Sequence, residues 1–202
     1  MLDKLPSLAE TVRQYDLGAN KKLGQHFLLD MNITDKIARL ALPLDNVHVA
    51  EIGPGPGGLT RSLLKTGAAR VTVIEMDERF LPALKDIADH CDDRLVIIKG
   101  DALKVYIAKE LGNERPIKIA ANLPYNVGTK MLINWLTADP LFWQQAVLMF
   151  QKEVALRIVA RPGDPNYGRL AVLAQSVCDC KLAFDVPAYC CLLYTSPSPR
   201  DA

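Results

Sequence analysis

Short apolar runs alternate along the chain with longer stretches in which apolar residues recur every three or four positions. Such runs are typical of buried strands, and the recurring pattern is typical of amphipathic helices. The expected strands cover residues 47–52, 70–75, 95–98, 117–121 and 146–150, with a β-like stretch at 180–186. The expected helices cover residues 5–15, 32–42, 78–90, 128–137 and 168–177, and two more begin near residues 59 and 152.

Strands that are separated by helices pair in parallel through right-handed crossovers. The pattern therefore predicts a doubly wound α/β sheet that binds its ligand at the carboxyl ends of the strands. Residues 1–30 are expected to form a helix and a basic segment that covers the ligand, and residues 31–190 the α/β domain. Residues 191–202 carry a Ser-Pro repeat and are expected to be a disordered or non-native tail.

Composition excludes several classes of protein. Half of the 202 residues are apolar and 23% are charged, which is typical of a globular domain and excludes global disorder. No run approaches the ~18–20 apolar residues of a membrane span, and the first residues lack the order of a secretory signal. The five cysteines are therefore expected to be reduced thiols in a cytoplasmic protein, and their spacing predicts no metal site.

Charge is distributed unevenly. The net charge is +1 overall, but residues 1–114 carry a net −2 and residues 115–182 a net +4. The basic half could face phosphates, or the excess could be ordinary surface variation. Both interpretations stay open on this evidence.

A glycine-rich loop, residues 53–58, follows the strand expected at 47–52. Glycines allow a ligand to approach the backbone closely. Glu75 ends the next strand, 22 residues after Gly53, where a carboxylate can accept hydrogen bonds from ribose hydroxyls. Two cofactors fit, a dinucleotide or S-adenosylmethionine (SAM). The dinucleotide spacing is matched by Gly53, Gly55 and Gly58, but Pro54 and Pro56 remove N–H groups that phosphates would use, which favours a ligand without phosphates.

Polar residues also follow the third and fourth strands. The carboxylate of Asp101 can accept a hydrogen bond from the exocyclic amine of an adenine ring. Asn122-Leu123-Pro124-Tyr125 comes directly after the fourth strand. The Asn122 carbonyl and nearby backbone carbonyls could accept hydrogen bonds from both N–H groups of a nucleobase amine. This would direct the lone pair of the amine nitrogen at a methyl donor. Tyr125 could stack on the base, which is worth ~1–3 kcal/mol, so that positioning and electrostatics supply most of the rate.

Seven motifs together resemble the small-subunit rRNA adenine dimethyltransferases, the KsgA-type family. They are Leu23–Asp30 (LGQHFLLD), Glu51–Thr60 (EIGPGPGGLT), Val73–Asp77 (VIEMD), Gly100–Ala102 (GDA), Asn122–Asn126 (NLPYN), Gln151–Val154 (QKEV) and Tyr167–Leu170 (YGRL). The resemblance covers about residues 8–190 and implies a Rossmann-like, SAM-dependent methyltransferase fold. It implies that SAM is bound by His26, Leu28, Gly53, Glu75, Asp101 and Asn122, with Gly55 in the same loop, and that Asn122, Leu123, Pro124 and Tyr125 hold the target adenine.

The implied reaction is the transfer of two methyl groups to the exocyclic amine of each of two adjacent adenosines near the 3′ end of small-subunit (16S) rRNA. The partner would be an assembling ribosomal particle, and the enzyme is expected to be a monomer. Basic residues that could contact RNA phosphates are Lys21, Lys22, Arg157, Arg161 and Arg169. Family members continue with a last strand and a small helical domain, which are expected to be missing here because the match stops near Cys190.

Three other functions remain in view. A large-subunit rRNA adenine methylase of the macrolide-resistance type is the nearest, although such enzymes usually have Ile where Leu123 stands. A mainly non-catalytic ribosome-assembly factor is the second. A nicotinamide oxidoreductase is the third, but the sequence offers no catalytic group for hydride transfer.

Overall fold

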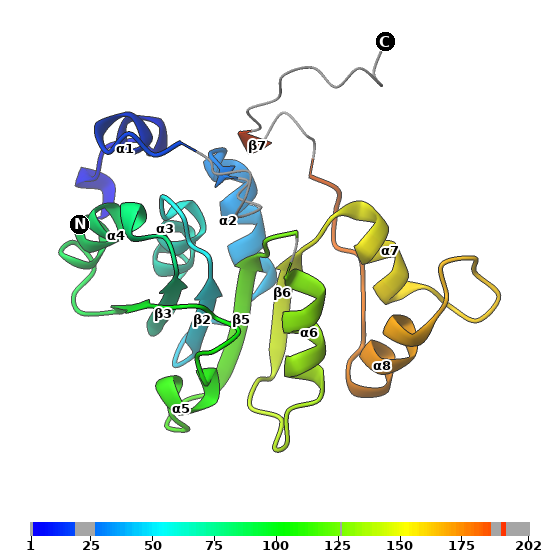
Figure 1. The fold of residues 1–202 in the computed structure, drawn as a ribbon. Helices are drawn as coiled ribbons and strands as arrows, with labels where there is room; N and C mark the ends of the chain where they lie inside the picture. The colour runs from blue at the N-terminus through cyan, green and yellow to red at the C-terminus, as the bar shows by residue number, and fades with distance from the viewer. Residues whose placement is uncertain (1, 19–26, 126, 187–190, 193–202) are drawn as a thin grey trace, which may run out of the picture.

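The computed structural model describes residues 2–18, 27–125, 127–186 and 191–192 of the chain (Figure 1). Its centre is a five-stranded sheet with the strand order β4-β3-β2-β5-β6, in which every neighbouring pair is parallel. The strands are β2 (His48–Ile52), β3 (Arg70–Glu75), β4 (Leu95–Lys99), β5 (Ile117–Asn122) and β6 (Gln145–Met149). The predicted doubly wound α/β fold is confirmed.

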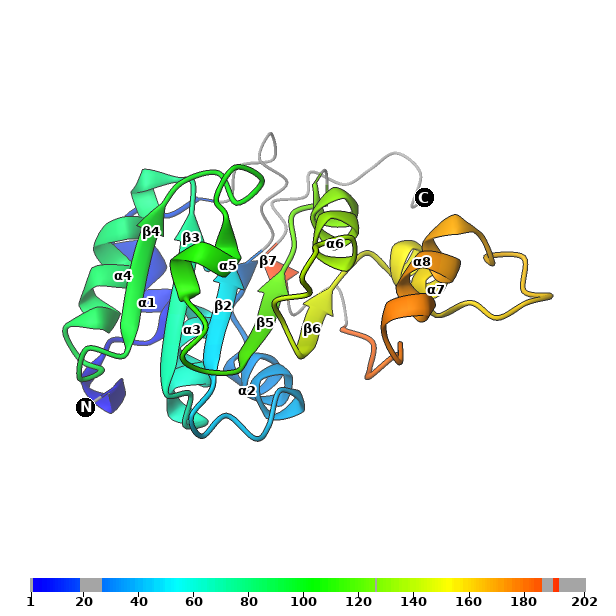
Figure 2. The same cartoon turned by 90° about the horizontal axis from the view of Figure 1, so that it is seen from below.

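Helices cover both faces of this sheet, so the domain has three layers (Figure 2). One face is covered by α2 (Met31–Leu40), α3 (Gly58–Lys65) and α4 (Leu81–Ala88). The other is covered by α5 (Ile107–Leu111), α6 (Gly128–Leu136) and α8 (Arg169–Val177), and α7 (Lys152–Val159) packs beside α8. Outside these layers lie the 3-10 turn η1 (Leu2–Lys4) and α1 (Leu8–Gln14).

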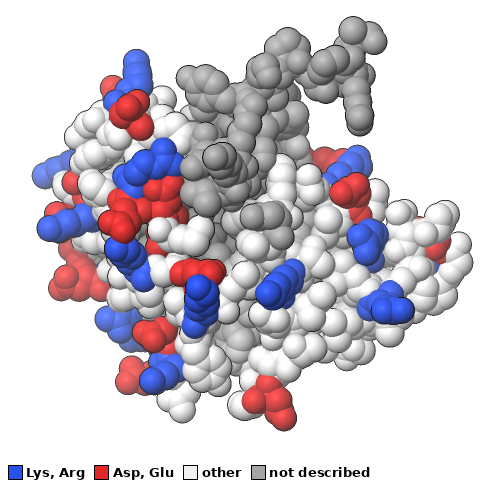
Figure 3. Space-filling model, viewed as in Figure 1, with Lys and Arg blue, Asp and Glu red and all other residues white. Residues whose placement is uncertain are grey.

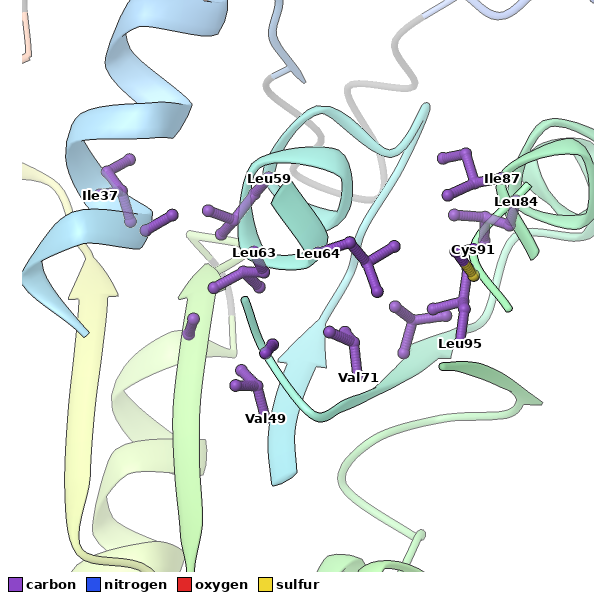
Figure 4. Packing of buried hydrophobic residues seen from close by; sticks show 14 of the residues in the cluster. Ile37, Val49, Leu59, Leu63, Leu64, Val71, Leu84, Ile87, Cys91 and Leu95 are labelled. Atoms are coloured by element: carbon purple, nitrogen blue, oxygen red, sulfur yellow. The ribbon is translucent and has the colours of Figure 1, made fainter. Parts of the chain in front are cut away.

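The continuous apolar runs of the strands are explained by burial on both faces. On β2, Val49 packs into the cluster under α2, α3 and α4, whereas its neighbour Ala50 packs into the opposite cluster. Figure 4 shows the first of these clusters, where side chains of α3 such as Leu63 meet Val49 and Val71 of the sheet. This packing fixes α3, and with it the loop that leads into α3.

The direction in which successive strands are added to the sheet reverses beside β2. The chain runs from β2 outward through β3 to β4, and then returns to β5 on the other side of β2. Ile52 pairs in register with Ala121, so the next residues, Gly53 after β2 and Asn122 at the end of β5, lie side by side at this edge of the sheet. Ligands of open parallel sheets bind at such a reversal, outside the carboxyl ends of the strands.

Two local predictions were wrong, and one helix was missed. Residues 180–186 form no strand, because no neighbouring strand among the described residues offers them backbone partners. The helix expected at 78–90 is a 3-10 turn, η3 (Glu78–Phe80), followed by α4. The five-residue helix α5 was not predicted, since it is too short for a helical pattern to be visible in the sequence.

A short two-stranded sheet joins distant parts of the chain. The strand β1 (Phe27–Leu28) pairs antiparallel with β7 (Cys191–Leu192). The first two residues of the predicted tail, 191–192, thus lie in β7, and residues 193–202 lie outside the described part. Within the described residues, the helices are all too short or too polar to traverse a bilayer.

Candidate active site

A pocket opens at the carboxyl ends of β2, β3, β4 and β5, where the strand order reverses. Seven predicted site residues line it, namely Gly53, Gly55, Glu75, Asp101, Asn122, Leu123 and Pro124. The remaining walls are largely apolar and come from Phe27, Ile52, Ile74, Met76, Phe80, Ala102, Leu103, Val127 and Met131, together with Asp77 and Gly100. Residues far apart in the sequence thus meet in one site.

The glycine loop reaches its shape through backbone conformations that other residues rarely adopt. Gly55 has a φ of +54° and Gly57 a φ of +87°. A Cβ atom at Gly57 would lie only 2.3 Å from Cδ1 of Ile87 on α4, so the loop also lies close to its neighbours. Gly55 lines the pocket, and the absence of a side chain there lets a ligand approach the backbone, whereas Gly57 lets the loop pack against α4.

Glu75, at the end of β3, is 5% exposed and lies against this loop. Its Oε2 accepts the N–H of Gly55 at 3.1 Å, and its Oε1 accepts the N–H of Asp77 at 2.8 Å. Burial raises the pKa of Glu75, and these two hydrogen bonds act in the opposite direction. Each carboxylate oxygen can accept more than one hydrogen bond, so ribose hydroxyls can still be bound.

A second buried acid, Glu51 on β2, was not predicted as part of the site. Its Oε2 accepts a hydrogen bond of 2.6 Å from the Thr60 hydroxyl on α3. Burial raises its pKa to about 8, and the charge of Glu75 adds to this effect, while the bond from Thr60 opposes it. Glu51 is therefore largely neutral at pH 7. A single acid inside an otherwise apolar strand is the signal in the sequence that could have identified it.

Asp101 follows β4 at the rim of the pocket. Its Oδ1 accepts the N–H of Leu103 at 3.0 Å, and the Nζ of Lys104 lies 4.0 Å from its Oδ2. The side chain is 35% exposed. A carboxylate at this place can accept hydrogen bonds from a polar ligand.

The turn after β5 is held by close packing. The carbonyl of Pro124 accepts the N–H groups of Val127 and Gly128, at 3.2 and 2.9 Å. A Cβ atom at Gly128 would lie 3.0 Å from Cβ of Leu123, so this glycine lets α6 begin directly behind the turn. Asn122 is half-buried and lines the pocket, whereas Tyr125 is 44% exposed and lies outside its lining.

His26 and Leu28 were also predicted to bind the cofactor. His26 lies outside the described residues. Leu28 is 6% exposed and belongs to the hydrophobic core rather than to the pocket lining, which Phe27 provides instead. The Phe27 ring packs edge-on against Phe80, with 5.3 Å between the ring centroids. Phe27 lies within the LGQHFLLD motif, but only the tertiary structure shows which of its residues faces the pocket.

These residues fit SAM better than a dinucleotide. SAM needs hydrogen-bond acceptors for its ribose hydroxyls and its adenine amine, which Glu75 and Asp101 can provide, and apolar contacts for its adenine ring, which the apolar walls can provide. A dinucleotide needs free N–H groups for its pyrophosphate. Pro54 and Pro56 have none, and the N–H of Gly55 is already bonded to Glu75.

Comparisons with known proteins agree with this geometry. The profile of the family "Ribosomal RNA adenine dimethylase" matches residues 17–201. A ribosomal RNA small subunit methyltransferase A from Maricaulis maris is 54% identical over 187 residues, which make up 93% of this chain and 65% of that protein. Its counterpart from Sinorhizobium medicae is 55% identical over 188 residues, with 92% and 68% covered. The chain thus spans about two thirds of the length of these relatives.

Two solved structures share the fold. A dimethyladenosine transferase from Plasmodium falciparum has a TM-score of 0.63 and 34% identity, and the match covers 74% of this chain and 52% of that one. The 23S rRNA methyltransferase ErmE has a TM-score of 0.59 and 27% identity, with 73% and 55% covered. Because the family profile spans nearly the whole sequence and the pocket carries the family's motifs, the chain belongs to the ribosomal RNA adenine dimethylase family.

Proposed function

We propose that this chain uses SAM to dimethylate the exocyclic amines of two adjacent adenosines near the 3′ end of small-subunit rRNA. The observation that carries the proposal is that two acids, the buried Glu75 and the half-buried Asp101, line the same pocket as Asn122, Leu123 and Pro124. The names of the bacterial relatives, ribosomal RNA small subunit methyltransferase A, support the choice of substrate.

The residues of the pocket divide into two groups. Glu75 would accept hydrogen bonds from the ribose hydroxyls of SAM, and Asp101 would accept one from the amine of its adenine. The glycine loop would leave room for the methionine chain of SAM. Bound SAM supplies a methyl group on a positively charged sulfur. The cofactor roles of Leu28 and His26 remain proposals that rest on the family resemblance.

The target adenine would lie at the Asn122–Tyr125 turn. Asn122 and the backbone carbonyls of the turn would accept the two N–H groups of the amine, which directs the nitrogen lone pair toward the methyl donor. Tyr125 is 44% exposed and would stack on the base. No general base is needed because the proton can leave to water after methyl transfer. The adenine must be presented unstacked from its neighbours.

The partner would be rRNA within an assembling ribosomal particle, bound by a monomer. Arg157, Arg161 and Arg169 are exposed on α7, on the loop after it and at the start of α8. Figure 3 shows that basic groups on this face are spread out and do not form one patch. We therefore expect each to contribute a separate phosphate contact, which would make binding weaker as salt rises. Lys21 and Lys22 lie outside the described residues.

The likeness to ErmE favours one alternative, a methylase of large-subunit RNA. Purified chain, labelled SAM and two substrates separate the two functions: small-subunit particles that lack the methyl groups, and protein-free large-subunit RNA. We expect label in adenosines of the particles only. Label confined to the large-subunit RNA would replace the proposal by the alternative.

A non-catalytic assembly factor is the remaining alternative. The variant Asn122→Ala should bind small-subunit particles as wild type does and transfer no methyl groups. If wild type also binds particles without methylating them, the chain acts by binding alone.

A further inference from the structure

Arg61 is a buried cation close to the cofactor pocket but outside its lining. It lies near the start of α3, just after the glycine loop, and is 6% exposed. Its Nη1 donates to the carbonyl of Pro6 at 2.6 Å, and its Nη2 donates to the Thr11 hydroxyl at 3.1 Å. Its Nε is buried and has no partner within the described part of the chain. A buried charge is costly unless it is paired and hydrogen-bonded; burial lowers the pKa of Arg61, and the charge of Asp86 opposes this effect.

What Arg61 holds is the N-terminal helix α1. The two acceptors lie just before α1 and within it, and the helix is preformed by a capping box between Ser7 and Glu10. At the other end of α1, the Tyr15 hydroxyl donates to Oδ2 of Asp86 on α4 at 2.5 Å. The helix α1 is thus fastened at one end to α3 and at the other to α4.

The helix α1 and the strand β1 meet at one glycine. A Cβ atom at Gly58 would lie 2.9 Å from Cδ2 of Leu8 on α1 and 2.9 Å from the carbonyl oxygen of Leu28 on β1. Phe27, the residue before Leu28 on β1, lines the pocket, and its ring would be 3.3 Å from a Cβ atom at Gly55. Thus α1 and the strand that carries Phe27 pack against the same residue of α3.

We propose that Arg61 is a positioning residue for the cofactor pocket. It fixes α1 on the first turn of α3, which keeps β1 against Gly58 and holds the Phe27 ring beside the glycine loop. The inference rests on the proposed function, since SAM is the ligand whose binding the wall would govern. Arg61 itself does not touch that ligand.

The test compares Arg61→Met with Lys65→Met. Lys65 lies one turn further along α3 and also pairs with the N-terminal segment, but its bond of 2.9 Å to Asp3 is exposed, with the two side chains 44% and 87% accessible. Such surface pairs contribute little. Calorimetry should show that Arg61→Met raises the dissociation constant for SAM at least fivefold, and that Lys65→Met changes it less than twofold. Equal constants in the two variants would overturn the proposal.

Two further variants distinguish positioning from general stability. Arg61→Lys should restore part of the affinity, because an ammonium can reach one of the two acceptors. Thr11→Val keeps the size of the side chain and removes one acceptor, so it stays informative if Arg61→Met fails to fold. We expect it to raise the dissociation constant more than Lys65→Met does. Unchanged affinity in Thr11→Val, with only a lower melting temperature, would contradict a positioning role.

Hydrogen exchange without ligand separates this proposal from the proposed function. Arg61→Met should exchange faster than wild type in α1 and at Phe27 and Leu28, while Lys65→Met should not. If wild type fails to bind SAM, the proposed function is wrong, and the exchange rates still decide whether Arg61 positions the wall. Equal exchange at Phe27 and Leu28 in wild type and Arg61→Met would overturn it.

Discussion

The Thr60 hydroxyl donates a hydrogen bond of 2.6 Å to Oε2 of Glu51 and thereby joins α3 to β2 across the glycine loop. The two residues flank the loop in sequence, and both are buried. Their hydrogen bond links β2, which leads into the loop, to α3, which follows it. The protonation of Glu51 therefore bears on the stability of the site.

Stability should fall as pH rises through the neutral range. The pKa of Glu51 is about 8 in the folded protein and has an ordinary value of 4.5. Between these values the folded state holds a proton that the unfolded state has released, so the free energy of unfolding decreases with rising pH. Urea unfolding at pH 5, 6.5 and 8 measures this slope. Glu51→Gln cannot ionise and should show a clearly smaller slope, whereas an identical slope in both proteins would refute the assignment.

Gly57→Ala should destabilise the fold more than Gly163→Ala. Both glycines have a left-handed φ, +87° and +94°, so alanine is strained at either position. At Gly57 the new Cβ would also meet Cδ1 of Ile87 at 2.3 Å, whereas at Gly163 nothing lies within 4 Å. We expect the difference between the variants to be about 1–3 kcal/mol in urea unfolding. Equal losses of unfolding free energy in the two variants would mean that Ile87 on α4 moves aside without an energetic cost.

Glu75→Gln should weaken SAM binding by tenfold or more. The amide group would turn one donor toward the N–H of Gly55 or of Asp77, where the carboxylate now accepts. An exposed acid on the next turn, Glu78, pairs with Lys99 at 2.5 Å and provides the control, since Glu78→Gln should leave affinity within twofold. Calorimetric titration measures both. Similar constants for the two variants would exclude Glu75 from the cofactor site.

Tyr125→Ala should slow methyl transfer at least tenfold while the dissociation constant for SAM stays within twofold. Tyr125 is 44% exposed and lies outside the pocket lining, next in sequence to Pro124, so it should act on the target base rather than on the cofactor. Tyr125→Phe keeps the stacking face and should retain most activity. Tyr106, which is 66% exposed, provides the matched control as Tyr106→Ala. A loss of SAM affinity in Tyr125→Ala would contradict this division of roles.

The sequence predicts most of the sheet because strands buried on both faces are continuous apolar runs. The range 70–75 expected for one strand is the range of β3. The prediction of a β-like stretch at 180–186 fails, because an apolar stretch becomes a strand only beside another strand with free backbone groups. It also misses α5, whose five residues are too few to show a helical period.

The site was predictable where its residues follow strands. Glu75, Asp101 and Asn122 stand directly at or after strand ends, and parallel strands bring such residues to one edge. Phe27 was missed because its place in the pocket depends on packing between distant segments. Glu51 was missed although it is the one acid within β2 and its partner Thr60 follows nine residues later. Phe27 reaches the pocket only through the contacts of β1 with the glycine loop.

A thermal unfolding scan with SAM, with NAD and without ligand tests the central claim most directly. A ligand that binds the folded state raises the unfolding temperature in proportion to its affinity and concentration. The account predicts one cooperative transition that SAM raises and NAD leaves unchanged. A cooperative transition that SAM does not move, or that NAD raises instead, would contradict the assignment of this pocket to SAM.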